Sequence, residues 1–172
     1  LVIASIFGPT IEEIGKVARK ISQAQPDFIE INISCPHANP SVRGFFYALP
    51  EATKRLTETV KKNTSIPIII KLSPNVVDIV AIAKAAEDGG ADAISAINTL
   101  GPGMIIDLES AKPILTNKVG GISGPAIRPI AIRCIYQIAQ AVKIPIIGMG
   151  GITYGRDAVE MIMAGATAVG VG

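Results

Sequence analysis

The stretch Ile66-Pro-Ile-Ile-Ile-Lys-Leu-Ser-Pro-Asn75 is a short apolar run that ends in polar residues. Apolar runs of this length, bounded by Gly or Pro, are typical of strands buried on both faces of a parallel sheet. The same pattern recurs along the chain, and amphipathic stretches with helical spacing separate the runs. We predict strands at 1–6, 28–33, 67–72, 93–97, 145–148 and 168–171, and helices at about 10–25, 50–63, 76–88, 125–142 and 155–164.

The alternation of strands and helices predicts an α/β fold with a parallel sheet and right-handed crossovers. Such a sheet is either open and doubly wound or closed into a (β/α)8 barrel. Polar residues or glycines follow the end of almost every predicted strand. In a barrel these strand ends meet at one mouth, whereas an open sheet gathers its ligands at a single switch point. We therefore predict a TIM (β/α)8 barrel.

Six predicted strands cannot close an eight-stranded barrel, and the 172 residues of the chain fall short of the ~200–250 usual for this fold. We expect a fragment that covers about six of the eight strands and lacks two opening strands and a closing helix. Residues 1–172 would then form a single barrel domain that is incomplete at both ends. A complete six-stranded α/β protein is the alternative.

The composition narrows the class of function. Hydrophobic residues make up 49% of the chain and charged residues 17%, which agrees with a largely buried α/β domain. The net charge of +2 and the lack of a basic run argue against nucleic-acid binding. No apolar run approaches the ~18–20 residues that span a membrane, and no signal peptide is recognisable, so we expect a cytoplasmic protein. The two cysteines lack CxxC spacing, which argues against a zinc site or a disulfide framework.

Cys35 lies in the run Asn32-Ile-Ser-Cys-Pro36, directly after a predicted strand. A thiol at the base of such a loop can serve as a general base when its pKa matches the proton it removes. Free cysteines are more often buried packing residues, but the polar neighbours of Cys35 favour the catalytic interpretation. Cys134 falls among apolar residues of the helix predicted at 125–142, and we interpret it as a packing residue. His37, the only histidine, is more typical of a solvated loop residue.

Lys71 closes an otherwise apolar strand. A buried ammonium is costly without a partner, and an anionic cofactor or substrate would supply one. An ion pair with Glu30 on the neighbouring strand is the alternative. We favour the ligand-binding interpretation because polar residues end the other strands as well.

Asn98 and Thr99 follow the next strand, and an amide suits a ligand edge that alternates carbonyl and N–H groups. Glycine clusters lie at 120–124, 148–151 and 170–172. Backbone N–H groups at such turns bind anions, and barrels often place a phosphate site after their last two strands. Turn formation alone is the other explanation for these glycines. The sequence has no Walker or Rossmann motif, metal-ligand cluster or Ser-His-Asp arrangement, so we expect no metal site.

These motifs together resemble the class 1 dihydroorotate dehydrogenase family. The resemblance runs in order across nearly the whole chain and rests on Asn32-Ile-Ser-Cys-Pro36, Lys71-Leu-Ser-Pro-Asn75, Ile97-Asn-Thr99, Gly120-Gly-Ile-Ser-Gly-Pro-Ala126 and Gly148-Met-Gly-Gly-Ile152. It implies the third to eighth strands of a barrel that binds FMN at its mouth. The reaction that it implies is oxidation of (S)-dihydroorotate to orotate in pyrimidine biosynthesis.

The resemblance also implies roles for individual residues. Cys35 matches the base that removes the C5 proton while hydride passes from C6 to the flavin, and Lys71 matches the residue beside the flavin ring. The implied pyrimidine-binding residues are Asn32, Asn98 and Thr99. The implied FMN contacts are Asn32, Lys71, Ile97, Gly124, Gly150, Gly151 and Gly172.

The run from Gly120 to Ala126 looks most like subclass 1B. In that subclass the FMN subunit pairs with an electron-transfer subunit that carries FAD and a 2Fe–2S cluster and uses NAD. Two cysteines are too few to hold such a cluster, which agrees with a separate partner in a heterotetramer; a homodimer is the other assembly that the resemblance allows.

Two departures from the family leave other functions open. His37 stands where the family commonly has Asn, and the loop 38–49 is not a close match. A barrel similar to dihydropyrimidine dehydrogenase, which reduces uracil or thymine, shares the run Ser-Cys-Pro-His and is the first alternative. A flavin-free barrel that binds a phosphorylated metabolite is the second, although it would have no use for Cys35 beside Lys71.

Overall fold

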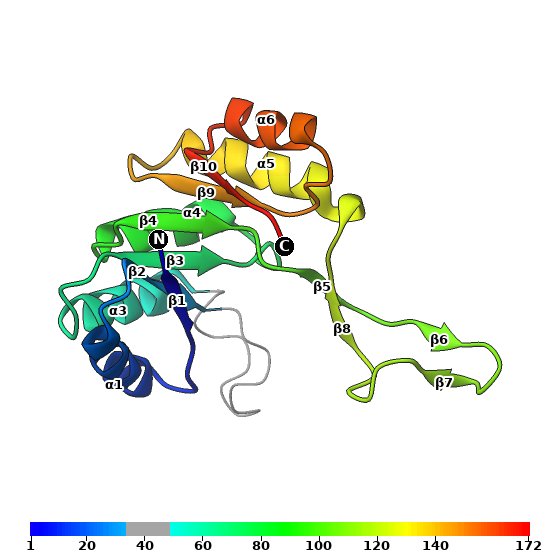
Figure 1. Cartoon of the computed structure of the whole chain (residues 1–172), viewed down its shortest axis with the longest axis horizontal. Coiled ribbons are helices and arrows are strands. Elements are labelled where there is room, and N and C mark those ends of the chain that lie inside the picture. The colour runs from blue at the N-terminus through cyan, green and yellow to red at the C-terminus, as the bar shows by residue number, and fades with distance from the viewer. Residues whose placement is uncertain (34–48) are drawn as a thin grey trace.

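The computed structural model describes residues 1–33 and 49–172. Its main element is a six-stranded parallel sheet with the strand order β1-β2-β3-β4-β9-β10 (Figure 1). The strands are β1 (Ile3–Ile6), β2 (Phe28–Asn32), β3 (Ile68–Leu72), β4 (Ala93–Ala96), β9 (Ile146–Met149) and β10 (Ala168–Gly170). Spatial order follows chain order without a reversal, which is the order of a barrel and not of a doubly wound sheet. The prediction of part of a (β/α)8 barrel is confirmed.

A helix follows each of the first three strands, another precedes β9, and a fifth lies between β9 and β10. The helices are α1 (Ile11–Ile21), α3 (Pro50–Lys61), α4 (Ile79–Asp88), α5 (Arg128–Ala139) and α6 (Gly155–Met163). Two short 3-10 helices, η1 (Ser22–Ala24) and η3 (Pro125–Ile127), extend α1 and α5. All five predicted helices are confirmed, and the 3-10 turns fill much of the longer spans predicted at 10–25 and 125–142.

The hydrophobic core lies between the sheet and these helices. Ile29, Ile31, Ile68 and Ile70 are fully buried on one face of β2 and β3. They pack in one cluster with side chains from every helix, including Ile14, Leu56, Ile82, Ile135 and Met161. Because side chains alternate along a strand, the opposite face takes the intervening residues. Those residues include Ser5, Glu30, Lys71 and Ser95, so the interior face of the half-barrel carries polar groups.

An antiparallel arm interrupts the alternation of strands and helices between β4 and α5. It consists of β5 (Leu100–Gly103) paired with β8 (Gly120–Ile122) and β6 (Ile106–Asp107) paired with β7 (Lys112–Pro113). Figure 1 shows this arm projecting away from the sheet. The prediction of a strictly alternating chain was therefore wrong in this region. The four strands have only two to four residues, and all but β6 contain Gly or Pro, so they leave no apolar run for a sequence pattern to detect.

None of the helices among residues 1–33 and 49–172 combines the length and the apolar character that crossing a membrane requires.

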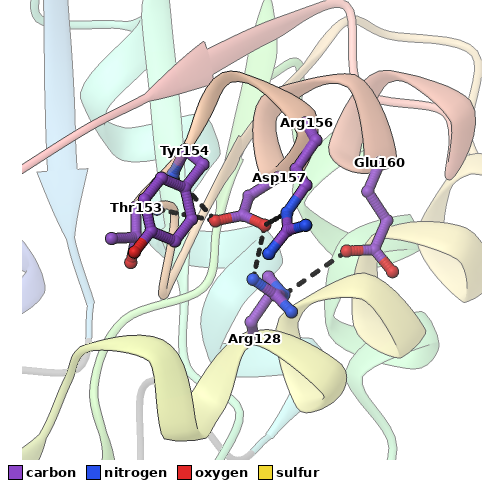
Figure 2. A network of polar contacts seen from close by, with 6 residues as sticks. All are labelled: Arg128, Thr153, Tyr154, Arg156, Asp157 and Glu160. Carbon is purple, nitrogen blue, oxygen red and sulfur yellow. Dashed lines mark hydrogen bonds and ion pairs between the residues drawn. The ribbon is translucent and has the colours of Figure 1, made fainter.

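A buried carboxylate, Asp157, joins α6 to α5 (Figure 2). Its Oδ2 accepts hydrogen bonds of 2.9 Å from the backbone N–H groups of Thr153 and Tyr154, and its Oδ1 accepts one from Arg128. The Arg128 guanidinium also lies 3.4 Å from Glu160. The backbone N–H of Tyr154 and then that of Thr153, together with the positive charge of Arg128, hold the pKa of Asp157 below its ordinary value. The ionised form of Asp157 therefore stabilises the folded state.

Asp157→Asn should lower the stability of the full-length protein, and the loss should depend on pH. Because the folded-state pKa is depressed, the carboxylate contributes fully above the unfolded value of about 3.9 and less as the pH falls below it. Urea unfolding midpoints should thus differ between wild type and variant at neutral pH and converge below about pH 4. Glu160→Gln, which removes the half-exposed partner of Arg128, should change the midpoint less. A pH-independent difference for Asp157→Asn would contradict this account.

Candidate active site

The carboxyl ends of the parallel strands bring several of the predicted site residues together. Asn32 ends β2 and is in register with Lys71 of β3, which is in register with Ser95 of β4. Ile97 and Asn98 follow β4 directly, and the peptide bond between Ala96 and Ile97 is cis. The Nδ2 of Asn98 donates a 3.1 Å hydrogen bond to Oδ1 of Asn32. The two amides thus form one polar edge beside Lys71.

Thr99 is held at this edge by the loop that follows β3. Asn75 Nδ2 donates a 3.0 Å hydrogen bond to the Thr99 carbonyl oxygen, and Asn75 Oδ1 accepts one of 3.0 Å from the Gly101 N–H. The Thr99 N–H in turn donates to Asn98 Oδ1 at 2.8 Å. Gly121 of the arm lies against Thr99, since a Cβ on Gly121 would come within 2.1 Å of its Oγ1. Asn75 is a structural residue of the site that sequence reasoning missed, although it lies in a motif already singled out.

Lys71 is partly buried and has a carboxylate neighbour. Its Nζ lies 3.6 Å from Oε1 of Glu30, with the side chains 23% and 11% exposed. The ion pair that the sequence offered as an alternative is therefore present. An ammonium has three N–H donors, so this pair is compatible with a second, anionic partner at the mouth of the half-barrel.

Glycine backbones pack closely where the loop after β9 meets the segment before α5. Gly150, Gly151 and Gly124 adopt φ angles of 125°, 75° and 86°, in the region that favours glycine. A Cβ on Gly151 would lie 2.7 Å from the Gly124 carbonyl oxygen and 2.9 Å from Cβ of Arg128. These glycines are thus required by the backbone geometry and bring two loops into contact. Gly172 follows β10, and a Cβ there would meet open space.

The Arg128–Asp157 network lies beside this glycine contact. The N–H groups of Thr153 and Tyr154 bind Asp157 (Figure 2), and both residues belong to the same loop between β9 and α6 as Gly150 and Gly151. Sequence reasoning did not identify either Arg128 or Asp157. An acidic residue in the first turn of the helix predicted at 155–164 is the local signal that was available.

The structure describes only one of the two cysteines. Cys35 and His37 lie outside the described residues. Cys134 lies in α5 and is 1% exposed, and burial raises the pKa of its thiol. The interpretation of Cys134 as a packing residue is confirmed.

Comparison with known proteins gives a consistent set of relatives. The chain is 53% identical to the protein named "Dihydroorotate dehydrogenase B (NAD(+)), catalytic subunit" of Geobacter sp. strain M21, over 99% of this chain and 56% of that one. Proteins of the same name from Alkaliphilus oremlandii and Methanothermobacter thermautotrophicus are 53% and 49% identical, with the same coverage. The chain therefore spans little more than half the length of these curated relatives.

A solved structure supports the fold. The crystal structure of DHODH from Eimeria tenella in complex with ferulenol matches with a TM-score of 0.74 at 22% identity. The match covers 94% of this chain and 48% of that one, as expected for part of a barrel. The family model described as dihydroorotate dehydrogenase matches residues 1–172, and the chain belongs to the dihydroorotate dehydrogenase family.

Proposed function

We propose that this chain is part of the FMN-binding catalytic subunit of an NAD-linked, class 1B dihydroorotate dehydrogenase. The protein would oxidise (S)-dihydroorotate to orotate in pyrimidine biosynthesis. The observation that carries the proposal is the set of groups at the strand ends: the ammonium of Lys71, the paired amides of Asn32 and Asn98, and the glycine turns. The relatives of about 50% identity named as catalytic subunits support the same reaction.

The described residues fit a flavin mononucleotide. A Cβ built on Gly124 would meet open space, so a phosphate could approach this backbone closely, while Gly150 and Gly151 bring the adjoining turn into contact with it. Lys71 places a positive charge at the same mouth, where it would favour negative charge on a flavin ring. Bound FMN would supply the hydride acceptor. Ile97, the apolar residue that directly follows β4, would lie beside it.

The chain's own residues would bind the substrate and move a proton. Asn32, Asn98 and Thr99 would hold the pyrimidine ring, whose alternating carbonyl and N–H groups match the donors and acceptors of amides. The Asn98–Asn32 and Thr99–Asn98 hydrogen bonds hold these groups in place before substrate binds. Cys35 would take the C5 proton as the general base.

The electron acceptor implies a partner. We propose an electron-transfer subunit that carries FAD and a 2Fe–2S cluster and passes electrons to NAD. The relatives' name, which specifies both NAD(+) and a catalytic subunit, supports this arrangement. The two cysteines of the chain are too few for the four ligands of such a cluster.

The full-length purified protein should be yellow and should bleach when dihydroorotate is added without oxygen. Dihydrouracil, which lacks the carboxylate of dihydroorotate, should leave its visible spectrum unchanged if dihydroorotate is the substrate. The visible spectrum before and after each addition is the measurement. Bleaching by dihydrouracil alone would assign the reaction of dihydropyrimidine dehydrogenase, and a colourless protein would favour a flavin-free barrel.

Cys35→Ala should slow flavin reduction by dihydroorotate at neutral pH by roughly a hundredfold or more, the usual contribution of a general base. Stopped-flow absorbance of the full-length protein measures this rate. Cys134→Ala is the matched control, since Cys134 is a buried packing residue of α5, and it should leave the rate unchanged. Equal loss in both variants would show that the proton is removed by another group.

Gly151→Ala should weaken FMN binding by about tenfold or more. The substitution forces a non-glycine residue into a φ of 75° and brings its Cβ to 2.7 Å from the Gly124 carbonyl oxygen. Quenching of flavin fluorescence on titration of the apoprotein gives the dissociation constant. Gly155→Ala, where the added Cβ meets open space, is the control and should bind FMN like the wild type. Unchanged affinity of Gly151→Ala would contradict a role for this turn in binding the cofactor.

A further inference from the structure

A carboxylate is held on the interior face of the half-barrel directly behind Lys71. Glu30 of β2 is 9% exposed, and three side chains from three neighbouring strands surround its carboxylate. Ser5 Oγ of β1 donates to Oε1 at 3.2 Å, Ser95 Oγ of β4 donates to Oε2 at 2.8 Å, and Lys71 Nζ of β3 lies 3.6 Å from Oε1.

These distances rank the partners of the carboxylate. The Ser95 hydroxyl makes a hydrogen bond of normal length and the Ser5 hydroxyl a longer one, whereas the 3.6 Å separation from Lys71 Nζ exceeds a normal N–H···O hydrogen bond. The hydroxyl groups therefore fix the carboxylate, and the ammonium is attracted to it without being fully neutralised by contact. Part of the positive electrostatic potential of Lys71 therefore remains at the mouth of the half-barrel.

The core does not account for this cluster. A buried ion pair is on average no more stabilising than apolar residues of the same volume, because desolvation offsets the attraction. The opposite faces of the same strands carry only isoleucine at the flanking positions 29, 31, 68 and 70. A charged pair with two dedicated hydroxyl donors on the interior face therefore points to a role at the site.

We propose that Glu30 is a positioning residue that sets how much of the positive charge of Lys71 reaches the flavin. The inference rests on the proposed function, because it takes FMN as the group beside Lys71. Ser5 and Ser95 hold the carboxylate back from the ammonium, and together the four residues set the relative affinity for reduced and oxidised flavin. Glu30 acts through Lys71 and does not touch substrate.

The test is the FMN midpoint potential of the full-length protein, measured by anaerobic titration against reference dyes. Glu30→Gln removes the negative charge while keeping the shape, so the potential should rise. One partly buried charge should change the ratio of the affinities for reduced and oxidised FMN by roughly tenfold. For a two-electron couple, this change corresponds to a shift of about 30 mV in the midpoint potential. Glu30→Asp keeps the charge and should return the potential toward the wild-type value.

Ser95→Ala supplies an opposite prediction. With one hydroxyl donor gone, the carboxylate turns to Lys71 as its stronger partner, so the ammonium is more fully neutralised and the potential should fall. Opposite shifts in Glu30→Gln and Ser95→Ala support the proposal. Shifts in the same direction would mark a general disturbance of the interior and overturn it.

Two further variants complete the test. In a Lys71→Met background Glu30→Gln should shift the potential less than it does alone, since coupled residues are not additive. Asp92→Asn breaks a lysine–carboxylate pair of the same kind on the surface, between Asp92 and Lys61, and should leave the potential unchanged. Full additivity with Lys71→Met, or an equal shift in Asp92→Asn, would overturn the proposal.

Failure of the proposed function can be told apart from failure of this inference. A yellow protein that dihydroorotate does not bleach would contradict the proposed substrate, while the potentials would still decide the role of Glu30. A protein that binds no FMN would overturn both.

Discussion

The register of the parallel strands is the constraint on which the rest of the structure depends. Asn32, Lys71 and Ser95 lie side by side because β2, β3 and β4 pair at fixed offsets. Those offsets are enforced by the opposite face, where buried isoleucines on β2 and β3 pack against the helices. A register shift of one residue would turn the isoleucines toward the interior and the lysine toward the helices, so it would disrupt the core and the site together. Packing and function are therefore specified by alternate residues of the same short strands.

The parts of the fold that the sequence predicts are those with a strong local period. Strands such as Ile68–Leu72 are nearly all apolar, and the helices repeat their apolar residues every three or four positions. The arm between β4 and α5 was not predicted because its strands are short and most of them contain Gly or Pro. The same limit applies to the site. Lys71 and Asn98 are visible as polar residues that end apolar strands, whereas Asn75 acts through a loop contact 24 residues away in the chain.

Asp157 shows why long-range electrostatics is the hardest part to infer. Its partner Arg128 lies 29 residues earlier in the chain. The sequence of neither helix indicates this pair, which forms only because α5 and α6 pack as neighbours. Once packed, the pair serves two elements at once. Asp157 holds the N–H groups of Thr153 and Tyr154 at the start of α6, and Arg128 lies against Gly151 in the adjoining turn. The close backbone contact between Gly124 and Gly151 is thus flanked by a charged network that holds the same two loops.

The interior face of the half-barrel carries charged and polar residues, unlike its outer face. The strand residues of β2 and β3 that face the helices are apolar, and removing their surface from water is enough to explain why they stabilise the fold. The interior face instead keeps a carboxylate and an ammonium, and uses two serine hydroxyls to satisfy the carboxylate. An apolar replacement would avoid the desolvation cost, so stability alone gives no reason to retain these charges. On the proposal that FMN binds beside Lys71, a lysine whose charge is reduced but not cancelled by Glu30 would shift the redox equilibrium of the flavin without fixing it at an extreme.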